Sequence, residues 1–137
     1  MISPFLACMT GVAAFYHLPP RVLPSIQAVE GGLPGLAHAN RDGSLDLGVM
    51  QVNSRWVQPL AHYTGMPQAA AEQRLLFDAC FNIAVAGAIM RICLDEARGD
   101  LLRAVGYYHS HSSPLAEDYQ RRVLRSATRL FSAGERH

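Results

Sequence analysis

The chain has 137 residues, of which 50% are hydrophobic and 17% are charged, and its formal net charge is +1. This length and composition are typical of one globular domain, which we expect to span residues 1–137. The small net charge argues against nucleic acid as the main partner. No apolar run approaches the roughly 20 residues that a membrane-spanning helix needs.

The spacing of the apolar residues predicts helices along almost the whole chain, so the expected fold class is all-α. In chain order, the predicted helices cover residues 8–16, 20–29, 54–63, 67–77, 78–97, 101–108 and 114–131. Proline and glycine separate several of them. The helix over 78–97 is long and apolar, which is typical of the central helix of a bundle. We expect the tail after Ala133 to fray.

Strand structure is expected at one place only. Asp42-Gly43 is a turn signal. It predicts a loop or a short irregular hairpin over residues 40–47.

Glu30 is the first candidate for chemistry, because it ends an apolar helix and precedes a glycine-rich turn. If this side chain faces an apolar cleft, lost solvation and the negative end of the helix dipole both raise its pKa. A carboxylic acid that keeps its proton near neutral pH is what the cleavage of a glycosidic bond requires. The alternative, which position alone favours, is that Glu30 is a solvated residue at a helix end.

Residues 40–56 read NRDGSLDLGVMQVNSRW. This stretch resembles the active-site segment of C-type lysozymes, and its GVMQ part is similar to the Gly-Leu-Met-Gln motif of soluble lytic transglycosylases. Together with DACFNI at 78–83 and AVGYYH at 104–109, it resembles the small lytic transglycosylases that accompany bacterial secretion systems, conjugation systems and type IV pili. The resemblance covers about Cys8 to Ser110 and implies a lysozyme-like fold.

The resemblance implies that Glu30 is the catalytic acid, which later acts as the base. Asp46 matches the second carboxylate of C-type lysozymes, where it would attack or stabilise the anomeric carbon. Alternatively, Asp46 braces its loop by accepting backbone hydrogen bonds. A lytic transglycosylase does not require a second carboxylate, because the 6-hydroxyl of the sugar attacks and gives a 1,6-anhydro product.

The same motifs imply residues that bind the substrate. Gln51 would hydrogen-bond a sugar, while Met50 is expected as wall or core, and Gly48 would allow a close backbone approach or only a bend. Tyr108 would donate to Glu30 and modulate its pKa, unless it is a core tyrosine. Asn82 is expected to line the cleft or to be structural.

Two positions depart from the family pattern. Gly31 stands where a serine usually follows the glutamate, and His109 stands where many relatives carry asparagine. His109 would hold substrate or be solvated. With His111 it makes only a pair of histidines without a carboxylate cluster, so we expect no metal site, and no cofactor.

The cysteines are Cys8, Cys80 and Cys93. The resemblance implies a disulfide between Cys8 and Cys80, which leaves Cys93 free; the alternative is three buried thiols. No Cys-x-x-Cys spacing is present, which argues against structural zinc.

The function that the resemblance implies is lytic cleavage of peptidoglycan glycan strands in the periplasm, in the service of an envelope-spanning machine. Two alternatives remain: a hydrolytic muramidase that uses Glu30 and Asp46, and a peptidoglycan-binding assembly protein with little turnover. Residues 1–15 are apolar but lack a basic leading segment and a small-residue cleavage site. We therefore expect the leader of an exported protein to be absent from this sequence.

Overall fold

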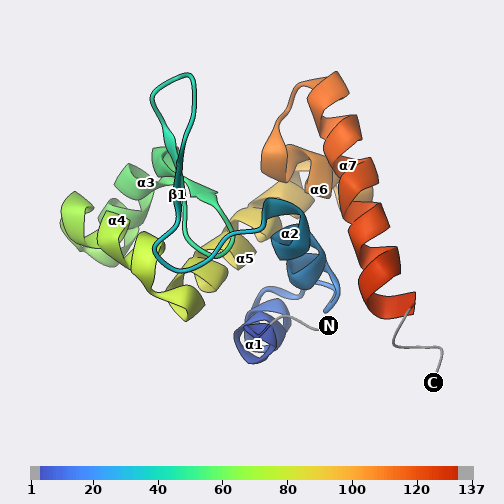
Figure 1. The fold of residues 1–137 in the computed structure, drawn as a ribbon, viewed down its shortest axis with the longest axis horizontal. Helices are drawn as coiled ribbons and strands as arrows, with labels where there is room; N and C mark the ends of the chain where they lie inside the picture. Colours follow the sequence, from blue (N-terminus) through green and yellow to red (C-terminus); the bar gives the residue numbers. More distant parts are fainter. Residues whose placement is uncertain (1–3, 133–137) are drawn as a thin grey trace.

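The computed structural model describes residues 4–132 and shows a mainly α-helical, lysozyme-like fold (Figure 1). Its helices are α1 (Leu6–Tyr16), α2 (Val22–Glu30), α3 (Val57–Thr64), α4 (Gln68–Phe77), α5 (Ala79–Glu96), α6 (Leu101–His109) and α7 (Ser113–Ala127). The strands are β1 (Ala37–Ala39), β2 (Leu45–Leu47) and β3 (Val52–Asn53). Two short helical turns, η1 (Ser54–Trp56) and η2 (Thr128–Ser132), precede α3 and follow α7.

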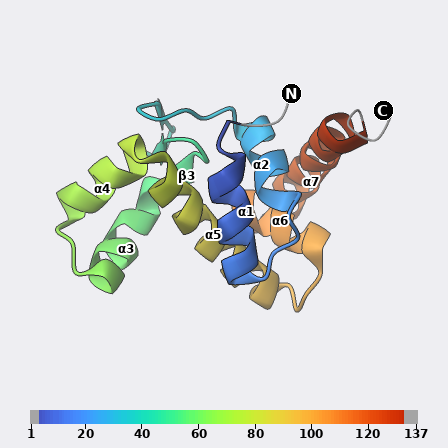
Figure 2. The ribbon, with the colours of Figure 1, turned by 90° about the horizontal axis from the view of Figure 1, so that it is seen from below.

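Helix α5 crosses the middle of the molecule. In both views, α3, α4 and the sheet lie on one side of it, and α1, α2, α6 and α7 lie on the other (Figures 1 and 2). Ile83, Met90 and Leu94 on α5 are buried and join the hydrophobic core, as the apolar spacing predicts. The prediction of a central helix is confirmed.

The small antiparallel sheet has the order β1-β2-β3 and one strand more than the expected hairpin. Gln51 adopts a left-handed φ of 52°, which turns the chain back so that Val52 pairs with Leu47. The helix expected from residue 54 therefore starts as the short turn η1. Asn53 caps that turn by accepting a hydrogen bond from the backbone N–H of Arg55 at 3.0 Å.

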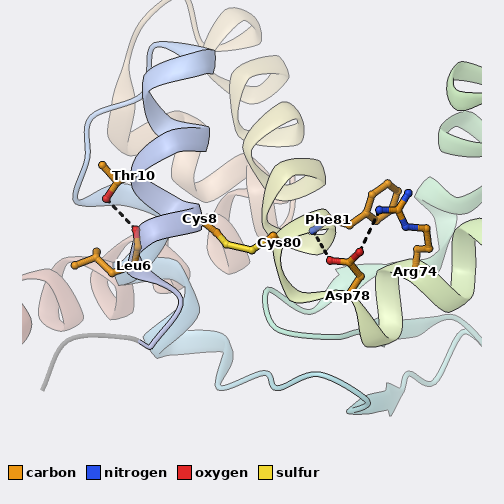
Figure 3. Close-up of a disulfide and its surroundings, with 7 residues drawn as sticks. All are labelled: Leu6, Cys8, Thr10, Arg74, Asp78, Cys80 and Phe81. Atoms are coloured by element: carbon orange, nitrogen blue, oxygen red, sulfur yellow. Dashed lines mark hydrogen bonds and ion pairs between the residues drawn. A yellow bond between two sulfur atoms is a disulfide. The ribbon is translucent and has the colours of Figure 1, made fainter.

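A disulfide between Cys8 and Cys80 joins α1 to the first turn of α5, as predicted (Figure 3). Beside it, Asp78 caps α5 by accepting from the N–H of Phe81 at 3.0 Å. Arg74 pairs with the same carboxylate at 3.1 Å and lies over the Phe81 ring (Figure 3). Cys93 is a free, buried thiol, also as predicted.

Asn82 of α5 fixes the loop that carries the GVMQ motif. Its side chain is fully buried and makes three hydrogen bonds of 2.8 Å, to the N–H of Met50 and to the carbonyls of Leu47 and Leu75. Both amide hydrogens and the side-chain oxygen of Asn82 thereby have partners. The side chain holds β2, the motif and the end of α4 in one arrangement.

Within residues 4–132, no single helix is long and apolar enough to cross a membrane. Only α4 and α5 taken together have the required length and composition, and these two helices are bent by 104° relative to each other. The prediction of a frayed tail after Ala133 lies outside the described residues. That residues 1–137 form one domain stays a prediction.

Candidate active site

Glu30 is the last residue of α2, and two glycines then lead the chain toward the GVMQ motif. Gly31 has a left-handed φ of 66° and closes the helix by donating its N–H to Gln27 at 2.7 Å. Gly32 lies so close to the carbonyls of Gly48 and Val49 that a Cβ at this position would collide with both. The close approach brings Glu30 beside the motif, although the two are separate in sequence.

Glu30 lines a cleft of about 260 Å³. Four other residues predicted for the site also line it: Asp46, Gln51, Tyr108 and His109. The remaining lining residues come mostly from the hairpin, β3 and η1: Asn40, Asp42, Ser44, Val52, Asn53, Arg55, Trp56 and Ile89. Apart from Ile89, these belong to the stretch that resembles lysozymes, but no individual signal singled them out.

The environment of Glu30 raises its pKa to about 7. Burial is the largest cause, and the negative charge of Asp46 adds to it. The positive charge of Arg122 and a hydrogen bond from Tyr119 act in the opposite direction. The carboxyl group is therefore divided between its protonated and ionised forms at neutral pH.

The tyrosine hydroxyl that contacts Glu30 differs from the expected one. Tyr119 of α7 donates to Oε2 of Glu30 at 3.4 Å, whereas the Tyr108 hydroxyl donates to the carbonyl of Met50 at 3.3 Å. Tyr119 is 1% exposed and lies outside every motif that marked the site. Its position on the inner face of the amphipathic helix α7 was the only available signal, and that signal indicates core packing.

His109 lies in the cleft and stacks on Tyr119, with ring centroids 4.7 Å apart and planes at 5°. Partial desolvation in the cleft and the charge of Arg122 lower its pKa, which favours the neutral imidazole. His111 instead pairs with Glu96 at 3.4 Å and stacks on Tyr107. The two histidines thus have different neighbours.

Asp46 lies on β2 opposite Asn53 of β3. The amide of Asn53 donates to Oδ1 of Asp46 and to the hydroxyl of Ser44, both at 3.0 Å. Ser44 in turn donates to Asp42 at 2.6 Å. The strand pairing and this side-chain network hold the carboxylate at the cleft wall.

Three residues expected to bind substrate do not line the cleft. Gly48, Met50 and Asn82 are buried, the last two completely. Gly48 has a left-handed φ of 71°, and its Cα faces the Leu75 carbonyl and the Asn82 amide, not open space. The structure therefore fits the structural alternatives given above for these three residues, which support the motif from beneath.

Gln51 lies at the cleft with its backbone in the left-handed region. Its side-chain amide donates to the carbonyl of Gly48 at 2.9 Å and to that of Leu36 at 3.3 Å. The amide nitrogen is thereby occupied, which leaves the side-chain oxygen as the group available to a ligand.

The comparison with known proteins now decides the family. The sequence profile described as "Transglycosylase SLT domain" matches residues 8–127. The chain belongs to this family. As a transglycosylase SLT domain protein it is an enzyme, a peptidoglycan lytic transglycosylase, and the cleft that holds Glu30 and Asp46 is the candidate site for the glycan.

Curated relatives carry the name "Invasion protein IagB", from Salmonella typhimurium strains SL1344 and LT2 and from Salmonella typhi. Each is 30% identical to this transglycosylase SLT domain protein over 119 residues, which cover 86% of the chain and 71% of the relative.

Proposed function

We propose that Glu30 is the acid and then the base in cleavage of the β-1,4 bond between N-acetylmuramic acid and N-acetylglucosamine. The observation that carries this proposal is the pKa of about 7 at a carboxyl group that lines a polar cleft. A group poised near the working pH can both give and take a proton.

In the first step, protonated Glu30 donates its proton to the glycosidic oxygen as the bond to the anomeric carbon breaks. In the second step, the carboxylate accepts the proton of the 6-hydroxyl, whose oxygen attacks the same carbon. The product is a 1,6-anhydro sugar, and no water is consumed. The Tyr119 hydrogen bond and the Arg122 charge favour the ionised form that exists between the two steps.

Asp46 would stabilise the positive charge that develops at the anomeric carbon. Its negative charge acts on Glu30, so both carboxyl groups face one space. The hydrogen bond from Asn53 holds Asp46 in place. In this proposal, Gln51, Tyr108 and His109 contact the sugar from the opposite walls of the cleft.

Product analysis tests the chemistry. Purified sacculi are digested with the wild-type protein, E30Q and D46N, and the muropeptides are separated by mass. We expect anhydro products, each lighter by one water than the hydrolysed form, from wild type. E30Q should release none and D46N fewer. Undiminished release by E30Q would refute the role of Glu30.

A muramidase is the second candidate, because Asp46 lines the same cleft as Glu30 and could act as a nucleophile. Products that carry the added water, lost in both E30Q and D46N, would favour it over the lyase.

We further propose that the protein acts in the periplasm and opens the wall for an envelope-spanning machine. The substrate lies outside the cytoplasm, and the relatives are named as invasion proteins. Cell fractionation with a tagged full-length chain tests the location; recovery only in the cytoplasm would contradict it.

A further inference from the structure

A second concave surface runs between α2 and α7, which lie side by side in both views (Figures 1 and 2). Its volume is about 930 Å³. Four arginines of α7 and η2 line it, Arg121, Arg122, Arg125 and Arg129. We call this surface the arginine groove.

Positive charge is concentrated here although the whole chain is nearly neutral. The groove holds four of the 12 basic residues of the chain, and no acidic residue among residues 4–132 lines it. Arg121 has a long, exposed ion pair with Asp118 at 3.7 Å. In the part of the chain that the structure describes, no carboxylate forms an ion pair with Arg125 or Arg129. Arginines near a helix C-terminus also complement the helix dipole, but that effect does not require them to line one groove.

The chemistry of the groove fits carboxylates attached to small apolar groups. A guanidinium group forms two parallel hydrogen bonds to a carboxylate, which makes arginine well suited to this recognition. Between the arginines, Ala28, Val29 and the 48% exposed Leu124 supply apolar surface. A ligand with both methyl groups and free carboxylates would use both kinds of contact.

The groove begins next to the catalytic acid. Ala28 and Val29 directly precede Glu30 in α2, and Arg122 is close enough for its charge to act on the Glu30 carboxyl group. The groove and the cleft share no lining residue, but both reach the C-terminal end of α2, so a ligand in the groove would lie near the molecule that Glu30 cleaves.

We propose that the arginine groove binds the carboxylates of the short peptides that muramic acid carries in peptidoglycan. These peptides contain alanine methyl groups, which match the apolar side chains of the groove, and free carboxylates, which match its arginines. A peptide of four residues in an extended conformation spans about 13 Å. The eight helical steps from Arg121 to Arg129 span about 12 Å, so the lengths match. This inference rests on the proposed cleavage at Glu30.

The test compares two substrates and three variants. The substrates are glycan strands with their peptides and the same strands stripped by an amidase. The variants are R125Q/R129Q, E30Q, and R103Q as a matched control, since Arg103 is exposed and lies outside the groove. Arg122 is left intact because its charge acts on Glu30. Thermal unfolding checks that each variant is folded.

For R125Q/R129Q we expect kcat/KM to fall about tenfold on peptide-bearing strands and less than about twofold on stripped strands. R103Q should match wild type on both. An equal loss on both substrates, or no loss on either, overturns the inference while leaving the role of Glu30 standing. The role of Glu30 fails separately, if E30Q still cleaves either substrate.

Discussion

The hydroxyl of Tyr119 donates a hydrogen bond to Oε2 of Glu30 at 3.4 Å, joining the inner face of α7 to the end of α2. The bond favours the ionised carboxylate, while burial of Glu30 and the charge of Asp46 favour the protonated form. These opposed influences leave the pKa at about 7. The pKa of the proposed catalytic acid therefore depends on a residue that no active-site motif contains.

Replacing Tyr119 should change the pH dependence of cleavage. Y119F removes the hydrogen bond that lowers the pKa of Glu30, so the pKa rises further. The fall of kcat/KM on the alkaline side, which reports loss of the acid's proton, should move upward by up to about one pH unit. A pH series of anhydro-muropeptide release measures the shift.

Y108F is the matched control, because the Tyr108 hydroxyl bonds to the Met50 carbonyl and not to Glu30. It should leave the position of the alkaline limb nearly unchanged, even if it lowers the rate. A larger shift in Y108F than in Y119F would show that the tyrosines have exchanged roles.

The raised pKa of Glu30 predicts how E30Q affects stability. Because the folded pKa of about 7 exceeds the reference of 4.5, the folded state holds the proton more tightly, and this stabilisation is lost as pH rises from 4.5 through 7. Above pH 8, E30Q should therefore be more stable than wild type by about 1–3 kcal/mol. At pH 4, where Glu30 is protonated, the difference should be small. Urea unfolding at both values measures it; equal effects at the two pH values would contradict the raised pKa.

Asn82 predicts a large loss of stability. N82A leaves the Met50 N–H and the Leu47 and Leu75 carbonyls without their buried partner. The free energy of unfolding should fall by about 3 kcal/mol or more. N40A removes a single, partly buried amide bond to Ser44 and should cost less than about 1 kcal/mol. Similar losses in the two variants would contradict the importance of the buried amide.

The disulfide between Cys8 and Cys80 should make the stability of the protein depend on redox conditions. Cys8 and Cys80 are 72 residues apart, so the double variant C8S/C80S should lose about 4 kcal/mol of stability by the chain-entropy model.

Burial, with the nearby charge of Glu96, raises the pKa of Cys93 to about 11. The native protein should therefore react slowly with a thiol reagent until it unfolds. Rapid labelling of one thiol in the folded wild type would contradict the buried position of Cys93.

Local signals in the sequence predict most of the fold. Apolar spacing locates the helices, and the proline and glycine breaks place their ends. The third strand was not predicted because it depends on the left-handed backbone of Gln51. This conformation is uncommon for residues other than glycine, so the sequence does not indicate it. The short turn η1, which Asn53 caps, was not predicted either.

The residues that line the cleft are predictable where chemistry and motif coincide, as at Glu30, Asp46 and Gln51. The site is not predictable where long-range packing decides. Tyr119 reaches Glu30 from 89 positions away, and only the packing decides between the two roles expected of Asn82, in favour of the structural one. Two tyrosines stand near the acid, with ring centroids 6.5 Å apart, and only the arrangement of α6 and α7 decides which one donates to it.

The most direct measurement is the titration of the Glu30 carboxyl group itself. Carboxyl carbon NMR of glutamate-labelled protein, with the signal assigned by its absence in E30Q, follows this one group from pH 3 to pH 9. We predict a midpoint near 7. A midpoint near 4.5, the ordinary value, would mean that Glu30 has lost its proton at neutral pH and cannot be the acid.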